Sequence, residues 1–219
     1  MRRDFPSLPL ERGQGVRWLC NVSELSENKM KAILLAAGFS SRMGELKQVM
    51  DWAGKPMVRQ IAEPLLAAGL ELVVVLGHQA ARVKAALHGL PCEYVVNAQP
   101  EAGMFSSVKI GCLTVPPGAA CLLTTCDCPG VQLCTIRAIQ DALAREPNKV
   151  VIPCYQGRKG HPVGLPAVLV EQIRTLPLTT PGLNSLWRAT SEILHELEVD
   201  DPAILHDFDR PEDRWNYRD

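Results

Sequence analysis

The chain has 219 residues, 47% of them hydrophobic, and its formal net charge is −1 at neutral pH. This balance lacks the excess of basic residues that binds a nucleic acid or an anionic membrane surface, so neither is expected as a partner. No apolar run approaches the roughly 20 residues that cross a bilayer. The composition predicts a globular protein with a substantial core.

Residues 1–29 are charged and irregular, with no apolar segment followed by small residues as in a signal peptide. They are interpreted as a disordered N-terminal extension, or as the product of an upstream start codon. A single domain is expected over 30–219, in the cytoplasm. The eight cysteines are therefore expected to be free thiols.

The remaining chain alternates apolar runs of strand length with helical patterns. Strands are predicted over 31–35, 71–76, 93–96, 120–125, 150–153 and 193–199, and helices over 57–68, 79–88, 104–113, 133–145, 166–176 and 184–190. Residues 155–160 have turn chemistry and are expected to join two short strands, and Pro211 is expected to open a last helix. This alternation predicts an α/β, Rossmann-like fold in three α/β/α layers with a mostly parallel sheet.

The most informative stretch is LLAAGFSSRMGELK over 34–47, where the first strand enters a glycine-containing loop. Glycines let backbone amides approach an anion closely, and Arg42 and Lys47 add fixed positive charge. The spacing matches neither a Walker A loop nor Gly-x-Gly-x-x-Gly. The loop therefore predicts a triphosphate site of another kind, with an ordinary strand-to-helix turn as the alternative.

Asp127 follows the predicted strand 120–125 and is expected to share a crevice with this loop, because ligands bind at the carboxyl ends of parallel strands. Four cysteines lie near the same strand end: Cys121, Cys126, Cys128 and Cys134. Their Cys-x-Cys spacing lacks the Cys-x-x-Cys knuckle of structural zinc sites. They are interpreted as small buried hydrophobes, with zinc as the lesser alternative.

Several segments, in this order, resemble the motifs of the MobA-like nucleotidyltransferases, the family of molybdenum cofactor cytidylyltransferases and guanylyltransferases. They are LAAGFSSRMGELK at 35–47, GKP at 54–56, GMFSSVK at 103–109, CDCP at 126–129, GHPV at 160–163 and DFDRPED at 207–213. The resemblance covers about residues 30–215. The GHP and DFDRPED segments, together with Ala37, favour the cytidylyltransferase branch.

The resemblance implies transfer of CMP from CTP to molybdenum-bound molybdopterin, with release of pyrophosphate. The product would pass to a molybdenum hydroxylase apoenzyme, which is then a transient partner. Three alternatives stay open. They are transfer from GTP, transfer to a sugar or alcohol phosphate, and a non-catalytic protein that binds and delivers the finished cofactor.

The resemblance also implies roles for individual residues. Nucleotide-binding residues are Leu35, Ala36, Ala37, Gly38, Ser40, Ser41, Arg42, Lys47 and Ser107; catalytic residues are Arg42, Lys47 and Asp127; the acceptor substrate is bound by His161 and Pro162. Mg²⁺ would be held by Asp127 and Asp209, with Asp207 left open. The alternative for the last two is the start of a helix at the following proline.

Three positions depart from the family pattern or stay open. The family's acidic-Gly-x-Arg segment is absent from 179–187, which puts the identity of the acceptor in doubt. Cys126 replaces a glycine and is expected to be tolerated because its side chain is small. Ser106 and Ser107 could contact the ligand or act as helix N-caps, and Lys109 could contact a phosphate.

Overall fold

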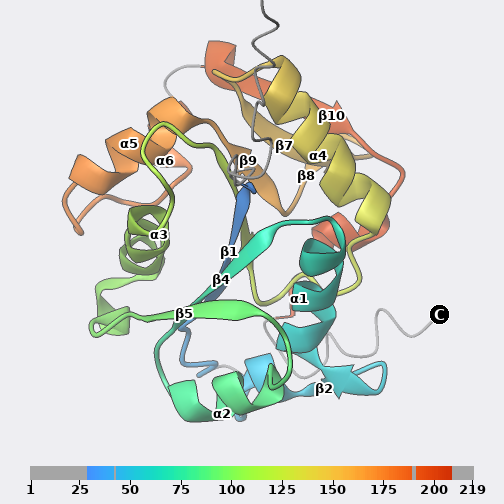
Figure 1. Cartoon of the computed structure of the whole chain (residues 1–219), viewed down its shortest axis with the longest axis vertical. Helices are drawn as coiled ribbons and strands as arrows, with labels where there is room; N and C mark the ends of the chain where they lie inside the picture. The colour runs from blue at the N-terminus through green and yellow to red at the C-terminus, as the bar shows by residue number, and fades with distance from the viewer. Residues whose placement is uncertain (1–28, 42, 189–190, 209–219) are drawn as a thin grey trace, which may run out of the picture.

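The computed structural model describes residues 29–41, 43–188 and 191–208. Its centre is an eight-stranded sheet in the order β10-β7-β9-β6-β1-β4-β5, with β8 paired to β7 (Figure 1). The strands are β1 (Lys31–Ala36), β4 (Glu71–Leu76), β5 (Cys92–Val96), β6 (Cys121–Thr125), β7 (Val150–Tyr155), β8 (Arg158–Lys159), β9 (Val163–Leu165) and β10 (Leu194–Glu198). The pairs among β5, β4, β1 and β6 are parallel, and β9 lies antiparallel to β6 and β7.

Helices cover both faces of this sheet (Figure 1). They are α1 (Met57–Ala67), α2 (Ala80–Ala86), α3 (Met104–Leu113), α4 (Leu133–Arg145), α5 (Ala167–Thr175) and α6 (Ser185–Arg188). Helices α1, α2 and α4 contribute to the core on one face, and α3, α5 and α6 to the core on the other. No helix in the described ranges is long and apolar enough to cross a membrane.

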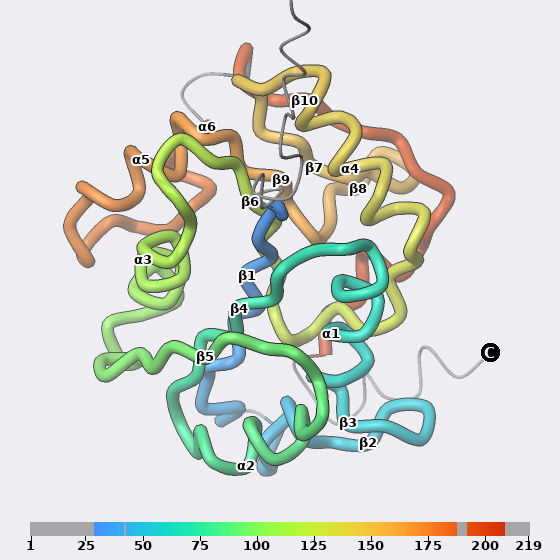
Figure 2. The backbone as a smooth tube through the Cα atoms, viewed as in Figure 1, coloured from blue at the N-terminus to red at the C-terminus, as the bar shows by residue number. Residues whose placement is uncertain are grey.

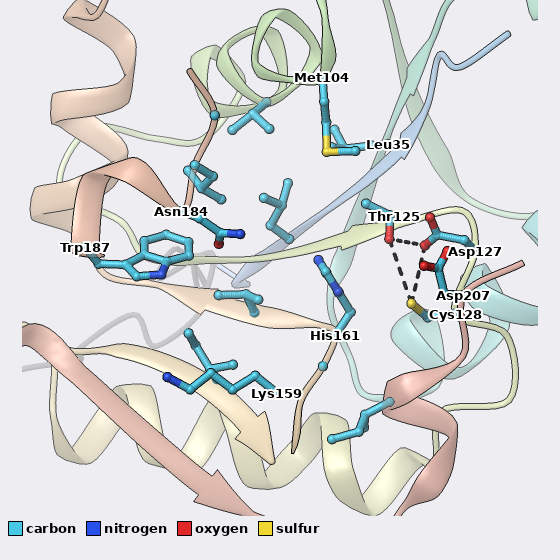
Figure 3. A pocket seen from close by; sticks show the side chains of 18 of the residues that line it. Leu35, Met104, Thr125, Asp127, Cys128, Lys159, His161, Asn184, Trp187 and Asp207 are labelled. Atoms are coloured by element: carbon cyan, nitrogen blue, oxygen red, sulfur yellow. Dashed lines mark hydrogen bonds between the residues drawn. The ribbon is translucent and has the colours of Figure 1, made fainter. Parts of the chain in front are cut away.

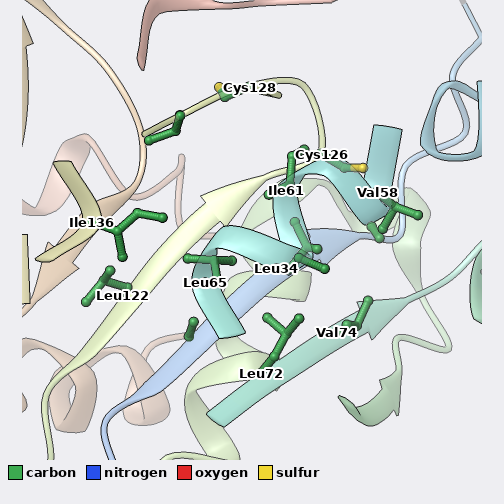
Figure 4. Packing of buried hydrophobic residues seen from close by; sticks show 14 of the residues in the cluster. Leu34, Val58, Ile61, Leu65, Leu72, Val74, Leu122, Cys126, Cys128 and Ile136 are labelled. Atoms are coloured by element: carbon green, nitrogen blue, oxygen red, sulfur yellow. The ribbon is translucent and has the colours of Figure 1, made fainter. Parts of the chain in front are cut away.

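Strand β1 shows why both faces are apolar. Ala32 and Leu34 point into one core, and Ile33 and Leu35 point into the other, because successive side chains of a strand alternate. Figure 4 shows Leu34 beside Ile61 and Leu65 of α1 in the first of these cores. A strand that is buried on both faces reads as a continuous apolar run, as this one does.

The predicted fold class is confirmed. Most of the predicted helices and strands begin and end within one or two residues of the expected positions. The sequence missed the hairpin of β2 (Asp51–Trp52) and β3 (Lys55–Pro56), and the 3-10 helices η1 (Lys47–Val49), η2 (Pro100–Ala102), η3 (Ser191–Ile193) and η4 (Pro202–Leu205). These elements span only two to four residues, too few for a period to be visible. The expected N-terminal extension, 1–29, lies outside the described residues except for Lys29, and the expected helix at Pro211 also lies outside them.

The chain returns through η4 to the strand ends of the sheet, and Figure 2 traces this path from β10. Gly160 permits the return. A Cβ atom at this position would lie 2.1 Å from the carbonyl oxygen of Ile204. The His161 amide donates to the same oxygen at 3.0 Å. The Gly-His-Pro segment is thereby held directly against η4.

Candidate active site

A small pocket of about 180 Å³ lies at the carboxyl end of β1. It is lined by the loop after β1, the start of α3 and the end of β6. Its lining residues are Leu35, Ala37, Gly38, Lys47, Gln48, Pro100, Gly103, Met104, Ser107, Thr125, Cys126 and Asp127. The glycine-containing loop after β1 and Asp127 thus share one pocket, as predicted.

Gln48 holds the loop in shape from inside the protein. Its side-chain amide donates to the carbonyl oxygens of Gly38 at 3.0 Å and Ala36 at 3.5 Å, and it accepts from the Ser40 hydroxyl at 3.1 Å. The residue is only 1% exposed. Ser40 in turn accepts from the amide of Lys47 at 3.0 Å. Ser40 therefore closes the loop through its side chain. Its backbone, with a left-handed φ of 54°, turns the chain at the same position.

Asp127 is the centre of the polar contacts. Its Oδ2 lies 3.5 Å from the Lys47 ammonium, and its Oδ1 accepts from the hydroxyl of Thr125 and from the thiol of Cys128 at 3.3 Å. Only 17% of its side chain is exposed. Burial raises the pKa of the Cys128 thiol, with the Asp127 charge adding to the effect, so this group stays a neutral donor.

The C-terminal segment is anchored at the same point. The Phe208 amide donates to the Asp127 carbonyl at 3.3 Å, and the Phe208 carbonyl accepts from the Lys47 ammonium at 3.3 Å. The Phe208 ring is buried and lies edge-on to Trp52, with ring centroids 4.5 Å apart. This packing places the neighbouring Asp207 in the wall of a second, larger pocket.

A second pocket, of about 1070 Å³, opens on the other side of Asp127. Both pockets include Leu35, Met104, Thr125 and Asp127 in their walls. Figure 3 shows Trp187 and Asn184 at one end of the large pocket and Asp127 with Asp207 at the other. The walls between are mainly aliphatic and aromatic. The arrangement gives two adjoining cavities with a carboxylate at their border.

His161 projects into the large pocket between these two ends (Figure 3). Burial lowers its pKa, and the charges of Asp127 and Asp207 raise it by a smaller amount. The imidazole is therefore neutral at neutral pH and can both donate and accept a hydrogen bond. Pro162 instead faces a separate small cavity beside α1, so the structure does not bring it to the large pocket with His161.

The predicted nucleotide-binding residues that line the small pocket are Leu35, Ala37, Gly38, Lys47 and Ser107; Ser40 closes the loop without lining either pocket, and Ala36 and Ser41 are also outside it. Ala36 is fully buried and contributes to the core beneath the loop, so only its backbone takes part. Ser41 is exposed in the turn and does not line either pocket. Arg42 and Asp209 lie outside the described residues.

The structure of α3 bears on the alternatives left open for Ser106, Ser107 and Lys109. Gly103 is the N-cap residue, with φ of 95°, and Ser106 and Ser107 lie within the helix, so neither is an N-cap. Lys109 donates to the carbonyl of Leu176 at 2.6 Å and so ties α3 to the end of α5. This bond places its ammonium at a helix C-terminus instead of at a phosphate.

The cysteines are dispersed. Cys121 packs in the core on one face of the sheet, whereas Cys126 and Cys128 pack in the core on the other, and Cys134 is exposed. Their interpretation as small buried hydrophobes is confirmed for the first three. The structure accommodates Cys126 at the family's glycine position, 3% exposed at the edge of the small pocket.

The segment that lacks the family's acidic-Gly-x-Arg residues forms a wall of the large pocket, including Leu183, Asn184 and Trp187. These side chains are uncharged. Sequence reasoning assigned no role to Gln48, Asn97 or Thr125, which hold or surround the predicted residues. Gln48 follows Lys47 directly, but no motif marked it.

The described carboxylates can be tested as ligands for a divalent cation. In the described ranges, no group of three or more His, Cys, Asp or Glu side chains is placed to hold a metal. Asp127 and Asp207 both line the large pocket, and the neighbouring donor is the Thr125 hydroxyl. Mg²⁺ commonly takes only one or two carboxylates and completes its octahedron with water and substrate phosphates. The oxygen donors present fit that kind of site.

A parallel sheet with a glycine loop and a carboxylate at its strand ends is characteristic of nucleotide-binding α/β proteins. A model of the MobA-like NTP transferase domain matches residues 32–195, and the chain belongs to this nucleotidyltransferase family.

Three curated relatives are similar at low identity. Nicotine blue oxidoreductase of Paenarthrobacter nicotinovorans is 26% identical, over 84% of this chain and 93% of its own length. Molybdenum cofactor cytidylyltransferase of Escherichia coli is 23% identical, over 83% and 91%. Probable molybdenum cofactor guanylyltransferase of Natronomonas pharaonis is 40% identical, over only 38% and 42%.

Solved structures share the fold. Rv0371c of Mycobacterium tuberculosis H37Rv is 25% identical, with a TM-score of 0.72, over 86% of this chain and 97% of that one. A nucleotidyl transferase of Methanothermobacter thermautotroptrophicus is 24% identical, with a TM-score of 0.74, over 87% and 96%.

Proposed function

We propose that this chain transfers CMP from CTP to molybdenum-loaded molybdopterin and releases pyrophosphate. The observation that carries the proposal is the pair of adjoining pockets with Asp127 at their border. The small one has room for part of a nucleotide, and the large one for an acceptor with a sizeable apolar part. The likeness to the cytidylyltransferase of Escherichia coli supports the choice of donor and acceptor.

In this reaction an oxygen of the acceptor's terminal phosphate forms a bond to the α-phosphorus of CTP. The bond from that phosphorus to the bridging oxygen breaks, and pyrophosphate leaves with the electron pair. Lys47 and Arg42 would bind the triphosphate and neutralise the charge that develops on the leaving group. The acceptor phosphate is already ionised, so His161 would bind the acceptor and need not remove a proton.

Asp127 would hold Mg²⁺ together with the C-terminal acidic segment that contains Asp207 and Asp209. The ion would supply charge neutralisation between the two anionic substrates. The chain's own part is to keep Asp127 oriented, through Thr125 and Cys128, and to keep Asp207 beside it through the Phe208 anchor. Transient contact with a molybdenum hydroxylase apoenzyme, which would accept the product, is part of the same proposal.

Pyrophosphate release tests the proposal directly. Purified protein, Mg²⁺ and molybdenum-loaded molybdopterin are incubated with CTP, GTP, ATP or UTP in parallel. We expect release with CTP alone. Release with GTP alone would assign the guanylyltransferase reaction. In a parallel assay with a sugar or alcohol phosphate in place of molybdopterin, release would assign the sugar- or alcohol-phosphate nucleotidyltransferases. Tight binding of finished cofactor without any release would favour the delivery protein.

Oxidoreductase activity is a second candidate, because nicotine blue oxidoreductase is similar over most of its length. The uncharged wall at Asn184 and Trp187 would suit a planar aromatic dye as well as a pterin. The test is oxidation of a reduced nicotinamide dinucleotide in the presence of a quinonoid dye, followed by absorbance. Dye reduction without pyrophosphate release would replace the transferase proposal.

A further inference from the structure

Asn97 is a buried amide that the predicted nucleotide site does not include. It follows β5 directly, and its backbone amide donates to the Leu76 carbonyl at the end of β4, at 2.7 Å. Only 3% of the residue is exposed. Its side chain is therefore held at the carboxyl ends of two parallel strands, beside the start of α3.

The hydrogen bonds of Asn97 fix which way its amide group points. Its Nδ2 donates to the hydroxyl oxygens of Ser106 at 2.7 Å and Ser107 at 2.9 Å. Its Oδ1 accepts from the backbone amide of Gln99 at 2.9 Å. A flipped amide would set Nδ2 against the Gln99 amide, donor against donor, so this network permits only one orientation.

The two serines differ in where their own hydrogens go. Each hydroxyl has one hydrogen to donate. Ser106 donates to the Gly103 carbonyl at 2.7 Å, within its own helix. The Ser107 hydroxyl accepts from Asn97, and its hydrogen has no recorded acceptor among the described residues. Ser107 is 5% exposed and lines the small pocket, whereas Ser106 does not.

We infer that Asn97 is a positioning residue that makes Ser107 a hydrogen-bond donor to the bound nucleotide. The inference rests on the proposed function, which puts a nucleotide in the small pocket. Because both hydrogens of the amide are directed at the serines, Ser107 cannot satisfy its hydrogen by donating to Asn97. Because the triphosphate is assigned to Lys47 and Arg42, we place the accepting group on the nucleoside, as a sugar oxygen or as a carbonyl oxygen or ring nitrogen of the base.

Substitutions of Asn97 and of Ser107 each remove the Ser107 hydroxyl as a donor to the nucleotide, by different means. Asn97→Asp keeps the shape of the side chain, but a carboxylate only accepts, so Ser107 would donate to it and lose its donor for the nucleotide. Ser107→Ala deletes the hydroxyl. Ser106→Ala is the matched control, because Ser106 is equally buried and bonds to the same amide but lies outside the pocket.

Isothermal calorimetry of the full chain with MgCl₂ and each of CTP, GTP, ATP and UTP measures the effect. For the nucleotide that the unsubstituted protein binds, Asn97→Asp and Ser107→Ala should each raise Kd about 3- to 10-fold, the usual effect of losing one neutral hydrogen bond. The double variant should match Ser107→Ala alone, since Asn97 then has no hydroxyl to orient. Ser106→Ala should stay within about twofold of the unsubstituted protein.

The 2′-deoxy and 3′-deoxy forms of that nucleotide distinguish the two sources of the acceptor. If the penalty of Ser107→Ala disappears with one of them, the acceptor is that sugar oxygen. If it persists with both, the acceptor is on the base. Either result supports the donor role.

Unchanged nucleotide affinity of Asn97→Asp, or multiplying effects in the double variant, would overturn the inference. If Asn97→Asp does not fold by circular dichroism, equal Kd values for Ser106→Ala and Ser107→Ala overturn it instead. No nucleotide binding by the unsubstituted protein would reject the proposed function itself, and this inference with it. Binding by that protein with no effect of the variants rejects the inference alone.

Discussion

The two pockets are built in different ways. The small pocket takes five of its twelve lining residues from one continuous segment, 35–48, whose shape is fixed by hydrogen bonds among near neighbours such as Ser40 and Gln48. The large pocket collects its wall from distant segments, from Leu35 in β1 to Asp207 near the C-terminus, and is largely apolar. The difference indicates that the wall at 35–48 is shaped by local contacts, whereas the large pocket depends on the tertiary fold.

Asp127 lines both pockets, so its substitution should have the largest effect on the proposed reaction. Asp127→Asn keeps the shape and removes the charge, and we expect kcat to fall at least about 1,000-fold, the upper range for losing one preorganised electrostatic group. Steady-state pyrophosphate release measures it, and calorimetry with CTP shows that the protein still binds nucleotide. Activity near that of the unsubstituted protein would remove Asp127 from the proposed mechanism.

Lys47 tests the small pocket alone. Lys47→Met keeps the aliphatic length and removes the ammonium that faces Asp127 and the Phe208 carbonyl. We expect kcat to fall about 100-fold, with Lys47→Arg retaining part of the activity as the charge-conserving control. The KM of the acceptor should change little. A rise confined to that KM, at constant kcat, would contradict the assignment of Lys47 to the triphosphate.

Trp187 tests the large pocket alone. Trp187→Leu stays apolar but loses the ring face, and we expect the KM of the acceptor to rise about 5-fold, in keeping with the energy of one aromatic contact. Trp187→Phe is the matched control and should remain near the original value. The Kd of CTP should be the same in both variants. An equal change in both substrates would show that the two pockets are not separable.

The smallest expected effect is on the pH dependence of stability. Burial lowers the pKa of His161 below its ordinary value, so below about pH 6.5 the unfolded chain binds more protons than the native one. The free energy of unfolding should therefore fall as the pH drops below that value. Burial also lowers the pKa of His206, which acts in the same direction.

Urea unfolding at several pH values measures this dependence, and His161→Gln should flatten the part due to that residue. If the free energy of unfolding of His161→Gln depends on pH in the same way as that of the unsubstituted protein, the pKa of His161 is not lowered by burial.

Much of the architecture could be predicted because periodicity is local. The apolar run of β1 and the amphipathic pattern of α4 appeared at the expected residues. The hairpin β2–β3 and η4 could not be found in this way, because their few residues are ordered by contacts with distant parts of the chain. Trp52, for example, packs against Phe208.

The candidate site divides in the same manner. The strand pattern placed the β1 loop and Asp127 at the strand ends, and the resemblance assigned His161 to the acceptor; in the structure the loop and Asp127 line the small pocket and His161 lines the large one. They placed Pro162 with His161, although the proline faces a cavity beside α1. They also gave no signal for Asn97 or Gln48, since a single buried amide has no pattern, and its role is visible only in the groups it bonds.

The sequence by itself determined the order of strands and helices, the family and the position of the glycine-containing loop, because these depend on spacing along the chain. Only the tertiary structure decided that two pockets meet at Asp127, that η4 brings Asp207 back to it, and that the Asn97 amide donates to Ser107. The physical reason is that hydrogen-bond polarity and cavity walls are set by which distant groups are buried together.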